Sequence, residues 1–353
     1  MTGASAFDEA GGWPAILGRI CSGADLDRNQ AHAVMSEILS GNATSAQIGG
    51  LLMGLAVKGE STDEMTGFVE SMLAASEPLS VPENALDIVG TGGSPHRRTH
   101  AVNASTMACI VAGAAGAIVC KHGNRRASST SGSFDFLEAL GIDITISPSE
   151  LERCVAELGV GFAYARSFHP AMRFAGPVRA ELGIPTVFNT LGPLAHPGRI
   201  KRQLVGVATE EKAAAVAAVL AELGSHRAWV VTGAGGLDEV STSGPSIIFD
   251  VSPAGIERLT VDLDEVGVDR VELSHVAGGT PEDNVAIFER MIDGEAGPHR
   301  DLVVINAGAG LVVAGLADDL EEGVSLANEA IDSGAAKEKL DRLRAFESGG
   351  AAD

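Results

Sequence analysis

Short apolar runs alternate with helical segments from about residue 81 onward, and this alternation restricts the possible fold more than any other feature. Residues 301–315 read as a strand that runs into a helix. The other runs typical of buried strands are 85–89, 117–121, 160–165 and 227–233. The segments typical of helices are 105–116, 135–141 and 210–224. Strands that alternate with helices predict an α/β fold with a central, largely parallel sheet.

The N-terminal part of the chain predicts a separate, all-helical unit. Residues 14–78 have apolar positions at helical spacing, and Thr44 and Ser61 stand where two of the helices begin. The Pro-punctuated stretch 170–195 interrupts the later alternation. The domain boundaries that we expect are a helical domain at 1–80, completed by about 170–195, and an α/β domain at 81–169 and 196–353.

Composition and charge exclude several classes of partner. The chain is 45% hydrophobic, which is enough for a large core, and its net charge is -22. Nucleic acid and anionic membranes attract basic surfaces, so we expect neither as a partner, and no stretch resembles a membrane span or signal peptide. Cys21, Cys109, Cys120 and Cys154 lack metal-ligand spacing, which predicts reduced thiols in a cytoplasmic protein.

A glycine-rich turn follows the first predicted strand and leads to a helix that opens at Asn103-Ala-Ser-Thr. Glycines expose backbone N–H groups, and a helix N-terminus adds unpaired donors and partial positive charge. Ser105 and Thr106 add hydroxyls. The segment fits neither the P-loop pattern nor the dinucleotide fingerprint. It predicts a cradle for phosphate or pyrophosphate, although a glycine-rich turn alone is commonly just a turn.

A second polar loop, 121–135, follows the next predicted strand. It carries Lys121, His122, Asn124 and several Arg and Ser residues. The carboxyl ends of parallel strands meet at one edge of a sheet, so both loops are expected at the same edge. A surface loop explains either segment alone, whereas the pair favours a shared polyanion site. An orienting hydrogen bond is the expected role of His122, rather than proton transfer.

Asp238 and Glu239 are adjacent carboxylates in a glycine-rich loop after the strand at 227–233. Mg²⁺ commonly takes one or two carboxylates and completes its shell with phosphates and water. In isolation the pair would read as surface charge, but beside a phosphate cradle it predicts a metal site. Arg179 lies in the stretch 170–195 and could hold a carboxylate in bidentate fashion. The alternative is an ion pair between Arg179 and Glu181.

Several motifs in combination resemble the anthranilate phosphoribosyltransferase family. They are GTGG with NAST, KHGNRRASS, LEALG, FHPAM, VRAELGIPTVFNTLGPL, GLDE and INAGAG, and the resemblance runs from about Asp27 to Leu343. It implies transfer of the phosphoribosyl group of 5-phosphoribosyl 1-pyrophosphate to anthranilate in tryptophan biosynthesis. It also implies two Mg²⁺ ions, a homodimer formed through the helical domain, and an active site in the hinge cleft between the domains.

The resemblance assigns roles residue by residue. The phosphoribosyl donor is bound by Gly90, Thr91, Gly92, Gly93, Asn103, Ser105, Thr106, Lys121 and Ser133. Anthranilate is bound or guided by Gly90, His122, Asn124, His169, Arg179 and Pro193. The metal is held by Ser105, Asp238 and Glu239. The residues expected to carry catalysis are Lys121, Asn124 and Arg179.

The chain departs from the family pattern around the first loop. Ser94 replaces the usual Asp, and the segment 94–102 is about three residues longer than usual. A Thr two residues before the Asn is replaced by Ala101. The departures elsewhere are the bulky Phe134 near the donor loop and His196 in place of Asn. These changes leave the donor-loop geometry open.

The longer loop also carries two arginines, Arg97 and Arg98, and two histidines, His96 and His100. Our hypothesis is that this local positive charge attracts an anionic donor to an acidic protein. The alternative is that Arg97 and Arg98 pair with surface acids.

Three rival functions compete with this interpretation. A pyrimidine nucleoside phosphorylase would need a pyrimidine-binding Arg, Ser and Lys set that the stretch FHPAMRF to VRAELG does not show. A non-catalytic nucleic-acid-binding member of the family is disfavoured by the net charge of -22. A transferase that uses another aromatic amine stays open.

Overall fold

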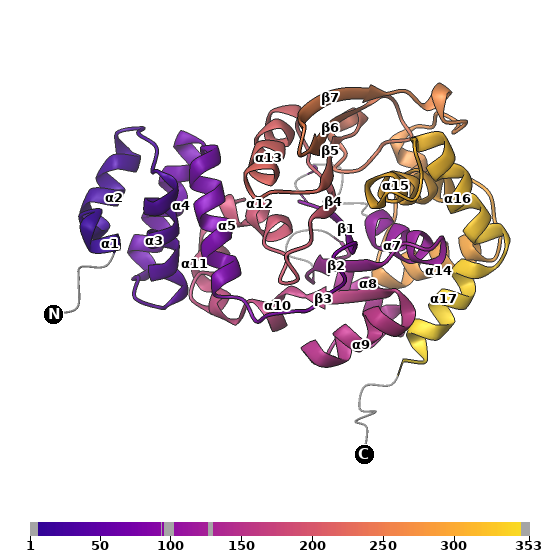
Figure 1. The fold of residues 1–353 in the computed structure, drawn as a ribbon, viewed down its shortest axis with the longest axis horizontal. Helices are drawn as coiled ribbons and strands as arrows, with labels where there is room; N and C mark the ends of the chain where they lie inside the picture. The colour runs from indigo at the N-terminus through magenta and orange to yellow at the C-terminus, as the bar shows by residue number, and fades with distance from the viewer. Residues whose placement is uncertain (1–5, 93, 95–101, 126–129, 347–353) are drawn as a thin grey trace, which may run out of the picture.

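The computed structural model describes residues 6–92, 94, 102–125 and 130–346. A layer of helices from the N-terminal part of the chain lies at one end of the molecule, and a sheet with helices on both faces forms the rest (Figure 1). The predicted fold class, a helical unit beside a larger α/β unit, is confirmed.

The N-terminal layer is built from capped, amphipathic helices. They are α1 Ala6–Glu9, α2 Gly12–Cys21, α3 Arg28–Leu39, α4 Ser45–Lys58 and α5 Thr62–Ala74. Thr44 and Ser61 cap α4 and α5, as predicted, and accept hydrogen bonds from Gln47 N and Glu64 N. Gly67 of α5 lets the helices approach closely, since a Cβ there would lie 2.2 Å from Arg28 O of α3.

The sheet has the strand order β3-β2-β1-β4-β5-β6-β7. The strands are β1 Leu86–Gly90, β2 Val119–Gly123, β3 Val160–Tyr164, β4 Arg202–Gly206, β5 Arg227–Thr232, β6 Ser246–Ser252 and β7 Gly255–Val261. Strands β1 to β5 pair in parallel, and β6 and β7 are antiparallel. From β1 the chain first adds β2 and β3 on one side of β1. It then returns and adds β4 on the other side of β1. The crevice between β1 and β4 is therefore the switch point at which such sheets bind ligands.

Helices cover both faces of the sheet. The helices that follow the N-terminal layer in the chain are α7 Ala104–Ala114, α8 Ser133–Ala139, α9 Pro148–Leu158, α10 Ala165–Phe168, α11 Gly176–Leu182, α12 Val187–Leu194, α13 Glu210–Glu222, α14 Pro281–Ile292, α15 Pro298–Ala314, α16 Leu320–Asp332 and α17 Ala335–Arg344. Four short 3₁₀ turns in the described residues are Pro170–Arg173, Ala234–Gly236, Leu263–Glu265 and Leu273–Val276. Successive strand residues point to opposite faces. Ile88 and Trp229 join the core under α7 and α14 to α17, whereas Val89 and Val230 join the core under α12, α13 and the helical layer.

Helices α11 and α12 pack against α4 and α5 of the N-terminal layer. Val178, Phe188 and Leu191 belong to the same buried cluster as Leu51 and Phe68. The stretch expected to complete the helical domain thus contacts it, while the domain boundaries themselves stay a prediction.

Two expectations for secondary structure need correction. Residues 301–315 form no strand, because α15 runs unbroken from Pro298 to Ala314. Pro298 stands at the start of the helix, where proline is favoured. Because α15 is buried on nearly every side, its Leu-Val-Val-Ile run has the same apolar pattern as a buried strand. The strand β4 and the β6–β7 hairpin were not predicted. β4 begins with the polar residues Arg202 and Gln203, and most of β7 is exposed.

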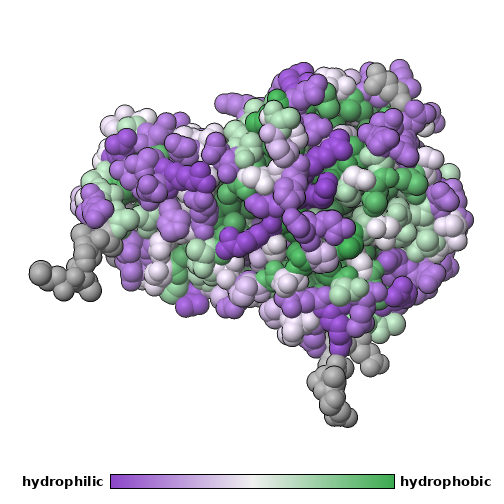
Figure 2. Space-filling model, viewed as in Figure 1, coloured by the Kyte–Doolittle hydropathy of each residue, from purple (hydrophilic) through white to green (hydrophobic). Residues whose placement is uncertain are grey.

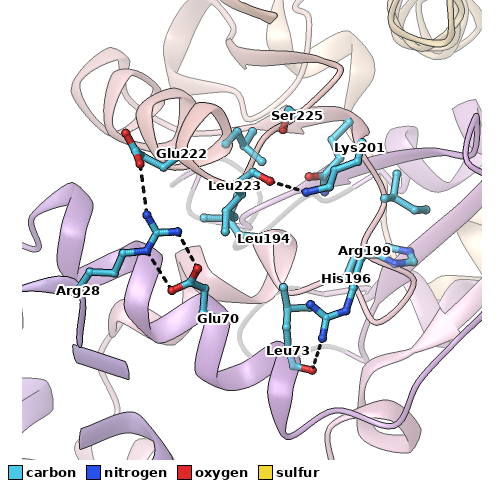
Figure 3. Close-up of a pocket in the computed structure, with 13 residues that line it drawn as sticks. Arg28, Glu70, Leu73, Leu194, His196, Arg199, Lys201, Glu222, Leu223 and Ser225 are labelled. Carbon is cyan, nitrogen blue, oxygen red and sulfur yellow. Dashed lines mark hydrogen bonds and ion pairs between the residues drawn. The ribbon is translucent and has the colours of Figure 1, made fainter. Parts of the chain in front are cut away.

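The two units meet in a polar seam (Figure 3). Arg28 of α3 pairs with Glu70 of α5 at 2.6 Å and with Glu222 of α13 at 3.3 Å. Arg199 donates to Leu73 O, and Lys201 donates to Leu223 O. These groups line a cavity of about 260 Å³ near the amino ends of β4 and β5. The cavity therefore lies away from the glycine-rich turns at the carboxyl ends.

The surface and the cysteines agree with the composition. Hydrophilic side chains cover much of both units on the face shown in Figure 2. The four cysteines are free thiols, and Cys109, Cys120 and Cys154 are buried.

Among the described residues, none of the helices is at once long and apolar enough to cross a bilayer.

Candidate active site

The two predicted loops meet at the carboxyl ends of β1 and β2. Lys121, the third residue of β2, donates to Ile88 O of β1 and lies 3.4 Å from Ser105 Oγ at the start of α7. Lys121 is 2% exposed, so its ammonium group is fixed inside this junction. The two loops thus lie side by side, and the shared ligand site stays a prediction.

Asn103 joins the same loops through its side chain. Ser131 Oγ donates to Asn103 Oδ1 at 2.7 Å, and Asn103 Nδ2 donates to Ser131 O at 3.3 Å. Asn284 Nδ2 of α14 also donates to Asn103 Oδ1, at 2.8 Å. Asn103 makes no capping bond to its own helix. The N-terminal amides of α7 are therefore left uncapped by this side chain, as an anion site requires.

Two buried hydroxyls at the first loop have no hydrogen-bond partner within the described residues. They belong to Thr106, in the first turn of α7, and to Ser94. Both residues are nearly inaccessible, at 1% and 0% exposure. A buried polar atom without a partner is costly and commonly marks a place that water or a ligand fills. This observation fits a phosphate group at the start of α7.

The carboxylates predicted to hold metal lie beside the glycine turn. Gly92 N donates to Asp238 Oδ2 at 2.8 Å. Asp238 and Glu239 are buried, at 1% and 3% exposure. Gly90 and Gly206 provide the space, because a Cβ would lie 2.7 Å from Asp238 Oδ2 at the former and 1.7 Å from Asp238 O at the latter. The carboxylate loop thus sits over the crevice between β1 and β4.

Thr91 and Gly90 fix the same crevice from the β1 side. Thr91 N donates to Gly206 O at 2.9 Å, which extends the pairing of β1 with β4 by one residue.

Within the described part of the chain, no group of three or more His, Cys, Asp or Glu side chains could hold a metal ion. Two carboxylates completed by phosphates and water suit Mg²⁺ better than an all-protein cage.

His122 points to the opposite face of β2 from Lys121. Its Nδ1 lies 3.1 Å from Gly192 O of α12, so Nδ1 carries the proton and Nε2 is an acceptor. Its Nε2 is buried and has no partner among the described residues. One strand end therefore presents a cation toward α7 and, from its other face, a hydrogen-bond donor toward Gly192 of α12.

Three histidine rings cluster on the α12 side. The ring of His122 lies 5.2 Å from that of His169 and 5.5 Å from that of His196. Burial lowers the pKa of all three, that of His122 well below its usual range and that of His196 to about 4. All three rings are neutral at pH 7, and each is held by one backbone carbonyl, of Gly192, Ala195 or Cys120.

Arg179 lies in the last turn of α11 with no carboxylate partner among the described residues. Its Nη2 lies 3.4 Å from Asn189 Oδ1, and its guanidinium lies 5.2 Å from the centre of the Phe188 ring. Burial lowers the pKa of Arg179. The ion pair with Glu181 that the sequence left open is not formed. Because Asn189 and Gly192 both belong to α12, this helix links Arg179 to His122.

The structure also describes four further residues that the sequence singled out: Asn124, Ser133, Phe134 and Pro193. Asn124 is exposed at the end of β2, and its carbonyl accepts a hydrogen bond from Ser133 Oγ at 3.1 Å. Pro193 is buried in α12, where its carbonyl accepts from Gln203 Nε2 at 3.1 Å. Phe134 is buried under the loop and stacks on Tyr164 at 4.9 Å. Its bulk therefore fills the core below the donor loop.

Some predicted residues lie outside the described part of the chain. They are Gly93, His96, Arg97, Arg98, Thr99, His100, Ala101, Arg126, Ser128 and Ser129. The hypothesis on the basic insert therefore stays a prediction.

Sequence reasoning missed some polar groups around the site. Asp87 of β1 is fully buried, and its Oδ1 accepts from His122 N at 3.2 Å. Burial raises the pKa of Asp87 to about 7, although Lys121 lowers it. A carboxylate inside an apolar strand is rare, and this feature of the sequence could have marked Asp87 as part of the site. Asn284, which holds the first loop from α14, gave no comparable signal, and Asn306 was noted only as part of the motif INAGAG, with no role.

Comparison with known proteins identifies the class first. Residues 14–76 match the helical bundle domain of a glycosyl transferase family, and residues 82–337 match the a/b domain of that family. These two matches together make the chain a member of a glycosyl transferase family.

Individual relatives identify more precisely the family to which the chain belongs. An anthranilate phosphoribosyltransferase of Rhodopseudomonas palustris (strain BisB5) is 44% identical over 95% of this chain and 98% of its own length. One of Methylorubrum extorquens (strain PA1) is 46% identical over 93% and 96%. The crystal structure of the Thermus thermophilus enzyme has a TM-score of 0.88 at 41% identity, covering 94% of this chain and 98% of that one. The chain belongs to the anthranilate phosphoribosyltransferase family.

A solved structure with ligands extends the comparison. The anthranilate phosphoribosyltransferase of Saccharomyces cerevisiae in complex with PRPP and Mg has a TM-score of 0.86 at 27% identity. It covers 95% of this chain and 97% of its own.

Proposed function

We propose that this chain transfers the 5-phosphoribosyl group of 5-phosphoribosyl 1-pyrophosphate (PRPP) to the amine of anthranilate. The products are N-(5-phosphoribosyl)anthranilate and pyrophosphate, in the second step of tryptophan biosynthesis. Family membership at 44% identity supports this reaction. The structural observation that carries it is the contact of Lys121 with Ser105, because it joins the two donor loops at one edge of the sheet.

We place the donor site where β1, α7 and β2 meet. The diphosphate lies against the turn of Gly90, Thr91, Gly92 and Gly93 and against the start of α7 at Asn103, Ser105 and Thr106. The buried Thr106 hydroxyl supports a ligand at this position. Lys121 supplies positive charge, and Ser133 borders the donor from α8. Fixed donors aimed at developing charge need no reorganisation during the reaction, which lowers its barrier.

Two Mg²⁺ ions bind with the donor, held by Asp238, Glu239 and Ser105. The pair of buried carboxylates over the β1–β4 crevice fits a hard cation that shares its shell with phosphate oxygens. The yeast structure in complex with PRPP and Mg supports binding of the metal together with the donor. When bound, Mg²⁺ neutralises the negative charge that collects on the leaving pyrophosphate.

Anthranilate binds on the α12 side of the same strand ends. Arg179 pairs with its carboxylate, since the guanidinium is half-buried and has no other carboxylate among the described residues. His122, His169 and Pro193 line the approach, and Gly90 and Asn124 border the reacting end. The neutral His122 can accept a hydrogen bond from the amine at Nε2. Its role is to orient the amine.

The reaction requires positioning more than acid–base chemistry. An aromatic amine is already neutral at pH 7, so no strong base is needed. The barrier lies in breaking the bond between the anomeric carbon and the pyrophosphate oxygen. Lys121 stabilises the departing charge, while Asn124 and Arg179 aim the amine at the carbon. We expect no covalent intermediate. Ping-pong initial-rate kinetics would contradict this.

The assembly and boundaries are part of the proposal. We propose a homodimer through the helical domain, supported by three exposed apolar side chains: Met53 and Val57 on α4, and Ile184 just after α11. We keep the domain boundaries at 1–80 with 170–195, and at 81–169 with 196–353. The free thiols support a cytoplasmic protein.

The test of the reaction is loss of anthranilate fluorescence. The account predicts that fluorescence falls only when anthranilate, PRPP and Mg²⁺ are all present with the enzyme. A decline that requires no PRPP, or phosphorolysis of a pyrimidine nucleoside by the enzyme, would refute the assignment.

A matched pair of lysine variants tests the donor site. Lys121→Met should lower kcat/KM for PRPP by about 10²–10³-fold, as removal of a charge-stabilising donor does. Lys201→Met is the control, because Lys201 also donates to a backbone carbonyl but lies in the seam. Equal effects of the two variants would remove Lys121 from the donor site.

A further inference from the structure

The motif INAGAG, residues 305–310, lies in α15 and has no role in the site described so far. Asn306 is its one polar side chain, and it is 2% exposed. Asn306 Nδ2 donates to Leu302 O at 2.8 Å and to Val240 O at 2.9 Å, and Asn306 Oδ1 accepts from Val240 N at 2.9 Å. All of its amide hydrogens and its oxygen are thus used.

The bonds to Val240 reach directly into the carboxylate loop. Val240 follows Glu239 and Asp238 without a break. Because one side chain holds both the N–H and the C=O of Val240, it fixes the position and the rotation of this stretch of backbone. The direction of the neighbouring carboxylates depends on that rotation.

Helix α15 is in turn fixed to the rest of the site. Gly308 lies against Gly323 of α16, where a Cβ on Gly308 would be 2.8 Å from the Gly323 carbonyl carbon. Gly310 lies against β1, where a Cβ would be 2.6 Å from Ile88 Cδ1. Two residues after Ile88, at Gly90, β1 ends and the glycine turn begins. The helix that holds the carboxylate loop therefore rests on the strand that presents the diphosphate loop.

We propose that Asn306 is a positioning residue for the metal site. It sets Asp238 and Glu239 relative to the glycine turn, and the INAGAG motif is the support that makes this possible. The inference rests on the proposed function, because it takes Asp238 and Glu239 as the metal ligands. Loss of groups that orient metal ligands commonly weakens metal binding by about 10- to 100-fold.

The experiment measures binding of Mn²⁺ in the presence of pyrophosphate, by electron paramagnetic resonance, on the full chain. Asn306→Ala should raise the Kd of Mn²⁺ by about 10-fold or more. Ile305→Ala is the control, because it removes a buried side chain from the same helix and leaves the hydrogen bonds of Asn306 to Val240 in place. It should leave the Kd within about 2-fold, even if thermal stability falls as far as in Asn306→Ala. Should Asn306→Ala fail to fold, Asn306→Asp keeps the acceptor for Val240 N but loses both donor hydrogens, and the same rise is expected.

Asp238→Asn separates this inference from the proposed function. If Asp238→Asn weakens Mn²⁺ binding and the Asn306 variants do not, Asn306 is a purely structural residue and the inference is wrong. The same holds if Ile305→Ala weakens binding as much as Asn306→Ala. If Asp238→Asn leaves Mn²⁺ binding unchanged, the metal site itself is misplaced, and the proposed function fails at that point.

Discussion

Gly92 N donates a hydrogen bond to Asp238 Oδ2 at 2.8 Å, across 146 positions in the sequence. The bond joins the turn proposed to hold the diphosphate to the loop proposed to hold its metal. Both lie over the crevice between β1 and β4, where the chain changes direction across the sheet. A diphosphate and its counter-ion could thus be bound together without a large movement of either loop.

Gly206→Ala tests whether the carboxylate loop needs this close approach. The new Cβ would lie 1.7 Å from Asp238 O, so the loop must move. We expect a loss of about 1–3 kcal/mol in the free energy of unfolding, measured with urea, and weaker activation by Mg²⁺. Gly18→Ala is the control, since nothing lies within 4 Å of its Cβ, and it should stabilise α2 by about 0.5–1 kcal/mol. Unchanged activation by Mg²⁺ in Gly206→Ala would contradict the account.

Arg179→Ala tests the carboxylate site for anthranilate. In the proposed function the guanidinium contacts the carboxylate of anthranilate and does not contact PRPP, so KM for anthranilate should rise by about 10-fold or more while KM for PRPP changes little. The control is Arg173→Ala, because Arg173 also lies over a phenylalanine ring, that of Phe174 at 4.4 Å. Initial rates with each substrate varied in turn give both constants. Equal rises in the two would show that Arg179 is not specific to anthranilate.

His196 makes stability depend on pH in the acidic range. Its folded pKa of about 4 is below the unfolded value of about 6.5, so the unfolded chain binds more protons and stability falls as pH decreases from 6.5 toward 4. Between pH 7 and pH 5 this residue should account for a loss of about 2 kcal/mol. His196→Asn should remove that part of the slope, as measured by urea unfolding at each pH. An unchanged slope would mean that His196 is accessible to protons in the folded state.

The basic insert predicts a dependence on salt. If Arg97 and Arg98 attract the donor, Arg97→Ala/Arg98→Ala should raise KM for PRPP at low ionic strength, and the difference from wild type should shrink as salt is added. Steady-state rates at several salt concentrations measure this. An unchanged KM at low salt would remove the steering role.

The sequence was most informative where chemistry and local structure coincide. Gly90, Gly92 and Lys121 stand directly after or within predicted strands, so their meeting at one edge followed from the parallel sheet. The fold class and the family could be predicted for the same reason. The individual roles of these residues stay predictions.

Long-range contacts could not be predicted in this way. Asn284 and Asn103 are 181 positions apart, and nothing local to α14 indicates that its asparagine bonds to the start of α7. The histidine cluster combines His122, His169 and His196 from three segments. The error at α15 arose because a helix buried on nearly all sides has no polar face, and periodicity then fails to distinguish it from a strand.

The central claim is that the turns after β1 and β2 bind one magnesium diphosphate together. A crystal structure of this chain with PRPP and Mg²⁺ tests it most directly. The account predicts a diphosphate between the backbone of Gly90 to Gly92, the start of α7 and Lys121, with metal on Asp238 and Glu239. A diphosphate bound elsewhere, such as beside Arg199 and Lys201 in the seam, with the turns left empty, would contradict the account.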